Sequence, residues 1–116
     1  MNKTKERRKE ERLQYHLPVW FSKDPNETAT RGIIVDISSS AMAFSCNADK
    51  NLPYLGQRLT TRFSLPHSGR NHSSSMKSFT RTGRVSRVES ISDNLCRVAI
   101  QFDDPPPFWD MPPIIE

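Results

Sequence analysis

Six short stretches of the chain have the pattern of β-strands: in most of them apolar and polar residues alternate, and residues 31–37 are rich in β-branched side chains. In the first stretch every odd position is apolar, from Leu13 to Phe21. A period of two is typical of a β-strand with one buried face, because successive side chains point to opposite sides of a sheet. We therefore predict strands at residues 13–21, 31–37, 41–46, 58–65, 79–90 and 95–103.

Turn-forming residues separate these predicted strands. The sequence Asp24-Pro25-Asn26 predicts a tight turn, and the Ser-rich residues 67–78 predict a mobile hairpin loop. Gly83 indicates either a bulge or a close backbone approach within its strand. Six short strands and no convincing helical stretch predict an all-β domain, either a sandwich or a barrel. A barrel is favoured because closure removes the unpaired edges of so small a sheet.

Composition divides the chain into a folded centre and two unusual ends. Its 116 residues suffice for one domain, and hydrophobic residues make up only 34%. We predict a flexible basic arm at residues 1–12, a barrel at 13–103 and a Pro-rich tail at 104–116. The net charge is +4, and six of the first twelve residues are basic. Such an arm favours an anionic partner, although a simple solvated tail has the same composition.

The tail combines prolines with large apolar side chains. Its five prolines exclude a regular helix and favour polyproline II. Its apolar residues, too many for an inert linker, are Phe108, Trp109, Met111, Ile114 and Ile115. Either they pack back onto the barrel, or they form a docking segment for another protein.

The sequence shows no features of a membrane protein, a metalloprotein or an enzyme. No apolar run approaches the roughly 20 residues that span a membrane, and no apolar region follows the basic N-terminus as in a signal peptide. Cys46 and Cys96 match no metal-binding spacing and fall on apolar strand faces, which predicts packed, reduced thiols. Motifs of known catalytic sites are absent from the sequence. We expect a cytoplasmic binding protein without a cofactor and without membrane insertion.

Three arginines form the first candidate binding motif: Arg7, Arg8 and Arg12. Arg8 and Arg12 are four residues apart, so they share a face in either a helical turn or an extended strand. Two guanidinium groups on one face can bind phosphate oxygens or the O6/N7 edge of guanine. Arg7 can approach from the flank or stack on a base. Arginines at this spacing are also common on charged helices, so this motif alone does not decide the function.

The second candidate motif follows the apolar segment GIIV and contains Asp36 and Ser38. A carboxylate can accept hydrogen bonds from N1–H and the exocyclic amine of guanine, and a serine hydroxyl can donate or accept. The same residue types also form ordinary turns. The specificity of the signal therefore lies in the combination of the two motifs.

Together the two motifs resemble those of the PilZ domain family, which carries RRxxxR before its first strand and [D/N]xSxxG after its second. Arg7, Arg8 and Arg12 match the first motif, and Asp36 and Ser38 match the second. The segments RLQYHLPVWF, LGQRLTTRFSLP and TGRVSRVESISDNLCRVAIQF are also similar to family strands. The resemblance spans about residues 6–103.

The resemblance implies a six-stranded antiparallel PilZ-type barrel whose arm folds over cyclic di-GMP, a bacterial second messenger. It implies that Arg8 and Arg12 hold guanine edges and phosphates, and that Arg7 adds a charge or a stacking contact. Asp36 and Ser38 would read the Watson–Crick edge of guanine from the barrel side. An arginine at position 7 favours a stacked pair of ligands over a single one.

The expected function is a stand-alone cyclic di-GMP receptor that changes conformation and signals to a protein partner in motility, biofilm or secretion control. One departure supports an alternative. Ala41 stands where the family usually has glycine, and a positive φ there would strain alanine by roughly 1–2 kcal/mol. The alternative is a degenerate adaptor that binds no ligand and acts only through protein contacts. A nucleic-acid-binding barrel is disfavoured, because strand aromatics other than Trp20 mostly alternate into the predicted core.

Overall fold

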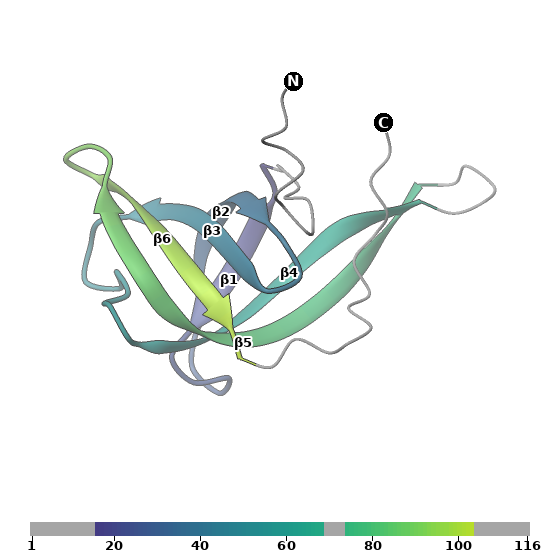
Figure 1. The fold of residues 1–116 in the computed structure, drawn as a ribbon, viewed down its shortest axis with the longest axis horizontal. Coiled ribbons are helices and arrows are strands. Elements are labelled where there is room, and N and C mark those ends of the chain that lie inside the picture. The colour runs from purple at the N-terminus through teal and green to yellow at the C-terminus, as the bar shows by residue number, and fades with distance from the viewer. Residues whose placement is uncertain (1–15, 69–73, 104–116) are drawn as a thin grey trace, which may run out of the picture.

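The protein folds as a closed, six-stranded β-barrel. The computed structural model describes residues 16–68 and 74–103, and these residues contain strands and no helix. The strands are β1 (Pro18–Ser22), β2 (Thr30–Ile37), β3 (Ala41–Asn47), β4 (Arg58–Ser68), β5 (Ser74–Ser90) and β6 (Leu95–Phe102). Their order around the barrel is β1-β2-β3-β6-β5-β4, and β4 pairs with β1 to close it (Figure 1). All six pairings are antiparallel, which confirms the predicted barrel.

The first strand is shorter than predicted. It begins at Pro18, and the two preceding residues, His16 and Leu17, are not in a strand. Proline suits the first position of a strand because it has no N–H to donate to the ladder. Residues 13–15, which were also predicted in this strand, lie outside the described residues.

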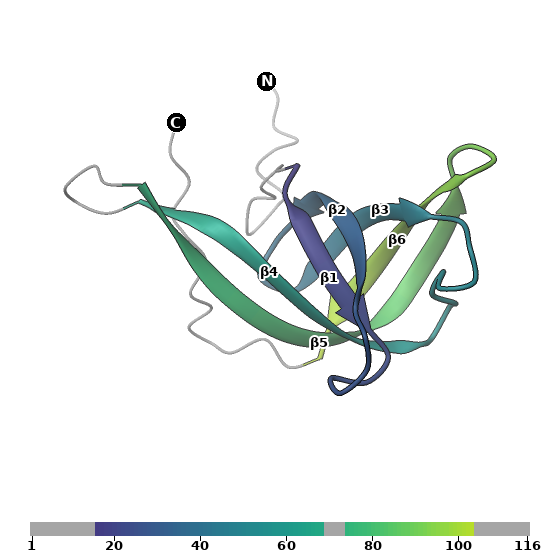
Figure 2. The same ribbon diagram turned by 180° about the vertical axis from the view of Figure 1, so that it is seen from behind.

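The β4–β5 hairpin is longer than predicted. β4 continues to Ser68 and β5 starts at Ser74, so the predicted loop at residues 67–78 is wrong in its bounds. Residues 69–73, for which mobility was also predicted, lie outside the described residues. The two paired strands project beyond the rest of the barrel as a twisted ribbon (Figure 2).

One continuous core fills the barrel. Its ring contacts include Phe21 stacked on Phe44, with centroids 4.8 Å apart, and Phe63 stacked on Phe79, at 5.5 Å. The buried core residues are Val19, Phe21, Ile34, Ile37, Met42, Phe44, Cys46, Leu59, Phe63, Leu65, Phe79, Val85, Val98, Ile100 and Phe102. They alternate with exposed or partly buried residues along the strands, which explains the period of two in the sequence.

Two turns have clear local causes. In the β1–β2 connection the N–H of Glu27 donates to the carbonyl of Asp24 at 2.9 Å, and the N–H of Asn26 donates to the Asp24 carboxylate at 3.0 Å. This confirms the turn predicted there. Before β4, the N–H of Gln57 donates to the carbonyl of Tyr54 at 3.0 Å across Gly56, whose φ is 84°. Glycine adopts this left-handed conformation without the steric cost of a Cβ.

Gly83 allows β5 and β6 to approach closely. A Cβ added at Gly83 would lie 2.5 Å from the carbonyl oxygen of Gln101 and 2.6 Å from a methyl group of Ile100. The prediction of a close backbone approach is therefore confirmed. The bulge in β5 lies elsewhere, between Val85 and Arg87.

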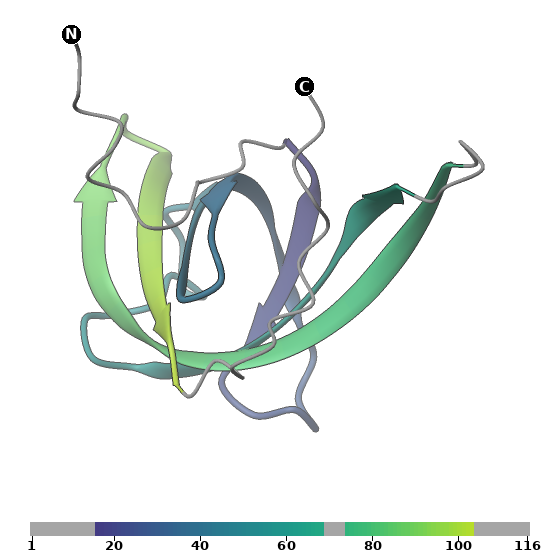
Figure 3. The same cartoon turned by 45° about the vertical axis from the view of Figure 1, so that its right-hand side comes forward.

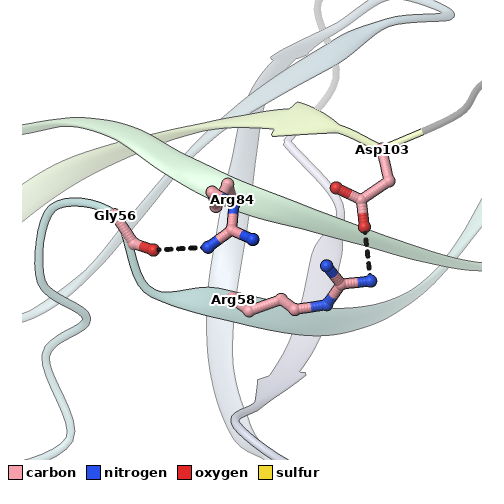
Figure 4. A network of polar contacts seen from close by, with 4 residues as sticks. All are labelled: Gly56, Arg58, Arg84 and Asp103. Atoms are coloured by element: carbon pink, nitrogen blue, oxygen red, sulfur yellow. Dashed lines mark hydrogen bonds and ion pairs between the residues drawn. The ribbon is translucent and has the colours of Figure 1, made fainter.

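Polar contacts fix the end of β6 against its neighbours. The carboxylate of Asp103 pairs with the guanidinium of Arg58 at 2.7 Å, and the N–H of Asp103 donates to the carbonyl of Thr82 at 2.9 Å. Nearby, Arg84 donates to the carbonyl of Gly56 at 3.2 Å (Figure 4). These contacts tie the point where the chain leaves the barrel to β4 and β5.

Candidate functional site

A β-bulge in β2 places Asp36 on the outside of the barrel. The register of β2 against β3 shifts between Ile34 and Asp36, which leaves Val35 as an extra residue. A regular strand that buries Ile34 would also point Asp36 inward and Ile37 outward. The bulge reverses this order. Ile37 is fully buried, and the partly buried Asp36 lies opposite Ala43 on the outer face.

A second bulge, in β5, places Arg87 on the outside of the barrel. The register of β5 against β6 shifts between Val85 and Arg87, with Ser86 as the extra residue. Val88 consequently packs against the core, and the exposed Arg87 lies opposite Ala99. Bulges commonly change the direction of side chains next to functional sites. Here the bulge in β2 lies against β3 and the bulge in β5 lies against β6, and β3 and β6 are paired with each other.

The two re-aimed residues lie in one cross-strand row, which we call the outer row: Asp36, Ala43, Ala99 and Arg87. Each residue is directly opposite the next across β2, β3, β6 and β5, and Figure 3 shows these strands side by side. Three interstrand spacings of about 4.8 Å separate the ends of the row, about 14 Å along the sheet. The row therefore has a carboxylate at one end and a guanidinium at the other.

Small side chains flank the centre of the outer row. Ala41 and Ser45 lie on either side of Ala43 on the outward face of β3, and Ala99 is the neighbour of Ala43 on β6. We call these four residues the platform. Because none of them projects far from the sheet, a flat or ring-shaped ligand can approach the backbone closely here.

The rim of the platform on the β6 and β5 side is polar and basic. Arg97 and Gln101 flank Ala99 on β6, and both are exposed. Arg87 forms an ion pair with Glu89 at 3.7 Å, but both side chains are well exposed. Exposed ion pairs are weak, so a phosphate can compete with Glu89 for Arg87. This side of the platform is suited to an anionic group.

Ser38 holds the turn that follows Asp36. Its side chain is nearly buried, with 7% of the residue exposed. Its N–H donates to the carbonyl of Ala41 at 2.8 Å, and its hydroxyl accepts from the N–H of Ser40 at 3.4 Å. The carbonyl of Ser40 in turn accepts from the N–H of Phe102 at 2.8 Å. Ser38 thus fixes the β2–β3 hairpin, and its predicted contact with a guanine stays a prediction.

Ala41 does not need the conformational freedom of glycine. It is the first residue of β3 and is paired with Gln101 of β6. Strand backbone has negative φ, which every L-residue adopts without left-handed strain. The strain considered for alanine at a positive φ therefore does not arise at this position.

The three arginines of the first motif, Arg7, Arg8 and Arg12, lie outside the described residues. The described part of the chain begins with His16 and Leu17. The carbonyl of Leu17 accepts a hydrogen bond from the N–H of Ile34 at 2.7 Å, immediately beside the β2 bulge. The described chain therefore begins beside the bulge in β2.

Sequence reasoning missed Arg87 and Arg97 as candidate site residues. A signal for Arg87 was present, because Val85 and Val88 are apolar and three apart, where a regular strand requires an even spacing. Such a spacing within a strand indicates a bulge. Arg97 carried no comparable signal, since its place beside the platform depends on the pairing of β6 with β3.

The other candidate chemistries find no support in the described part of the chain. Cys46 and Cys96 are buried free thiols directly opposite each other on β3 and β6. Burial, followed by the neighbouring Cys96 and Asp49, raises the pKa of Cys46 to about 11, so it is a poor nucleophile at neutral pH. Residues 16–68 and 74–103 contain no cluster of three metal-ligating side chains and no helix long and apolar enough to cross a membrane.

Comparison with solved structures shows a similar fold in the Bacillus subtilis inhibitor of motility (MotI/DgrA). The TM-score is 0.66 and the sequence identity 15%, over 86% of this chain and 44% of that chain. This chain thus matches less than half the length of that protein. No curated protein matches the sequence significantly.

Comparison with family models gives a match to the PilZ domain over residues 6–107. The matched region includes the three arginines of the arm, both bulges and the whole platform. PilZ is a binding domain and not a catalytic one. The family, the closed barrel and the two motifs agree, and this chain belongs to the PilZ domain family.

Proposed function

We propose that this PilZ domain is a receptor for cyclic di-GMP that changes conformation on binding and signals to a protein partner. The observation that carries the proposal is the outer row. Two bulges place Asp36 and Arg87 at opposite ends of a shallow platform, and Leu17, which follows the arginine-bearing arm in the sequence, is hydrogen-bonded to β2 next to the first bulge. Family membership supports the same ligand class.

The ligand's chemistry matches the residues around the platform. Cyclic di-GMP has two guanines and two phosphates, so it requires both cationic groups and a base-edge acceptor. Asp36 accepts from N1–H and the exocyclic amine of one guanine, and Ser38 supports it from the turn. Arg8 and Arg12 bind guanine edges and phosphates, where each bidentate pair contributes about 1–3 kcal/mol of discrimination. Arg7 adds a charge or a stacking contact.

The platform and its basic rim complete the proposed site. Ala41, Ala43 and Ala99 leave room for the macrocycle against the sheet. Arg87 and Arg97 supply positive charge on the side opposite Asp36. A ligand held between the rim and the arm would thus contact cations on both flanks.

The proposed output is a change in the arm. An arm that becomes ordered over the ligand exposes a different surface to a protein partner, and this couples binding to signalling. We place the receptor in the bacterial cytoplasm, in control of motility, biofilm formation or secretion. The structural neighbour's description as an inhibitor of motility favours the first of these.

The second candidate function is an adaptor that binds no ligand. It is favoured by Ala41, whose methyl group occupies the platform at the position of the usual glycine. If the ligand requires that space, the arginines and Asp36 would no longer suffice for binding, and the domain would act through protein contacts alone.

Isothermal titration calorimetry with cyclic di-GMP separates the two candidates. The receptor proposal predicts saturable binding by the wild type, no measurable binding by Arg8→Ala or Arg12→Ala, and little change in Lys5→Ala, a basic residue outside the motif. The stoichiometry reports whether one ligand or a stacked pair binds. Absence of binding by folded wild-type protein would favour the adaptor, with Ala41→Gly as the next variant. Unchanged affinity in both arginine variants would reject the arm as part of the site.

A further inference from the structure

An apolar groove lies across β1, β4 and β5, on the side of the barrel away from the platform. Its volume is about 270 Å³, and its apolar lining comes from Leu17, Pro18, Trp20, Phe63, Met76 and Phe79. Trp20 is 44% exposed and Met76 is 55% exposed. Large apolar side chains gathered in one groove on the surface of a small domain indicate a site that another segment covers.

We propose that residues 104–116 of the same chain, the Pro-rich tail, dock in this groove. The direction in which the chain leaves the barrel favours this occupant. β6 runs antiparallel to β5 and ends with Phe102 opposite Gly83, and Asp103 continues the pairing by donating to Thr82. β5 extends from Thr82 back to Ser74. A chain that continues in the direction of β6 therefore runs along β5 towards Met76.

The length of the tail fits this path. From Thr82 to Met76, β5 spans about 20 Å at about 3.3 Å per residue. The tail rises about 3.1 Å per residue in polyproline II, so Trp109 comes level with Met76. The whole tail spans about 40 Å in this conformation, which is ample to cross the groove.

The starting point of the tail is fixed in a way that favours this course. Asp103 is held by Arg58 on β4 and by the carbonyl of Thr82 on β5. These two contacts keep the exit of the chain over the β4–β5 pair, whose outer surface also contributes Arg62 and Thr80 to the groove.

The composition of the tail complements the groove. Proline-rich segments commonly bind to grooves lined by aromatic side chains, because the preformed polyproline II helix loses little conformational entropy on binding. The groove offers the exposed side chains of Trp20 and Met76, and the tail offers Phe108 and Trp109.

Charge supports the same occupant. The tail has three acidic residues and no basic one, whereas the groove is lined by Arg62 and by no acidic residue. Residues 1–12 precede Leu17, which lines the groove, but six of these twelve residues are basic. Repulsion from Arg62 therefore disfavours the arm as the occupant.

Tryptophan fluorescence of the full chain tests the proposal. The sequence has two tryptophans, so Trp20→Phe leaves Trp109 as the only reporter and keeps an aromatic ring in the groove. We expect blue-shifted emission of Trp109 and severalfold weaker quenching by acrylamide than in a free peptide of residues 104–116. Adding Met76→Glu should shift the emission to the red and restore strong quenching.

Two further variants make the result decisive. Ile91→Glu alters an apolar residue of similar exposure, 46%, in the β5–β6 turn, and it should leave Trp109 protected. Phe108→Ser changes only the tail and should release Trp109 without affecting the barrel. Quenching equal to that of the free peptide in the Trp20→Phe protein would overturn the proposal. So would protection that persists in both Met76→Glu and Phe108→Ser, or that is lost on dilution, which would identify the tail of a second copy as the occupant.

Discussion

Asp36 depends on one extra residue for its position. Without Val35 as the bulge residue, a strand that buries Ile34 would direct Asp36 towards the core, where an unpaired carboxylate is costly. The bulge satisfies two requirements at once, because it buries Ile37 and presents the carboxylate to the platform. Asp36 is therefore the barrel residue that most directly tests the proposed site.

We predict that Asp36→Asn weakens cyclic di-GMP binding by roughly tenfold to a hundredfold, since a bidentate contact to a base edge contributes about 1–3 kcal/mol. Thermal unfolding should change little, because the side chain lies on the outer face. Asp93→Asn, an exposed acid in the β5–β6 turn, is the matched control and should bind as the wild type does. Equal affinities of the two variants in calorimetry would exclude Asp36 from the site.

The sequence predicted Asp36 and Ser38 as two binding residues of one motif, but it did not predict that their environments differ. Asp36 lies on the outer face, whereas Ser38 is nearly buried and holds the hairpin. The difference arises from the hydrogen bonds around Ala41, which form only when β2 and β3 pair. A motif alone does not contain that information.

The strands β3 and β6 form the centre of the proposed site, and their outward side chains are small where the ligand would lie. We predict that Ala99→Leu abolishes or strongly weakens binding of cyclic di-GMP without loss of stability, because the added side chain fills the platform and not the core. Thr60→Leu makes a similar outward change on β4 and should leave binding intact. Binding by Ala99→Leu at wild-type affinity would place the ligand elsewhere.

A second prediction concerns the close contact between β5 and β6 at Gly83. Gly83→Ala should lower the free energy of unfolding by about 1–3 kcal/mol, the usual cost of overpacking, because its Cβ would lie 2.5 Å from the carbonyl oxygen of Gln101. Urea denaturation of this variant measures the effect. A stability equal to that of the wild type would mean that the two strands can separate there without cost.

The period of two predicted all six strands but not the full length of the β4–β5 ribbon. The reason is physical. The outer end of this ribbon projects beyond the barrel (Figure 2), and a strand that extends past the core is not required to alternate apolar and polar residues. The positions of the bulges were also missed, because the prediction offered a bulge at Gly83 and did not use the odd spacing of Val85 and Val88.

For the whole molecule, the sequence favoured a closed barrel only because closure removes the unpaired edges of a small sheet. The pairing of β1 with β4 closes the barrel. The residues in that pair, such as Val19 and Phe63, are far apart in the sequence. Their register follows from the closed arrangement of all six strands, which no local pattern specifies.

The stability of the barrel should decrease in alkaline solution. Burial raises the pKa of Cys46 from its ordinary value of 9.0 to about 11 in the folded protein. As the pH rises, the Cys46 thiol therefore loses its proton in the unfolded chain before it does so in the folded protein. The contribution of this thiol to the free energy of unfolding is fully present below pH 9 and is lost as the pH rises to about 11. Urea unfolding across this range should show a shallower loss in Cys46→Ala than in the wild type. If the free energy of unfolding depended on pH identically in both proteins, the raised pKa of Cys46 would be contradicted.

The proposed binding face is tested most directly by titrating isotopically labelled protein of residues 1–116 with cyclic di-GMP and recording NMR spectra. The largest shifts of amide resonances should occur along the outer row, at Asp36, Ala43, Ala99 and Arg87. Amides of the opposite wall, such as Trp20 and Arg62, should move little. Saturable shifts centred on β1 and β4, with the outer row unchanged, would contradict the proposed binding face.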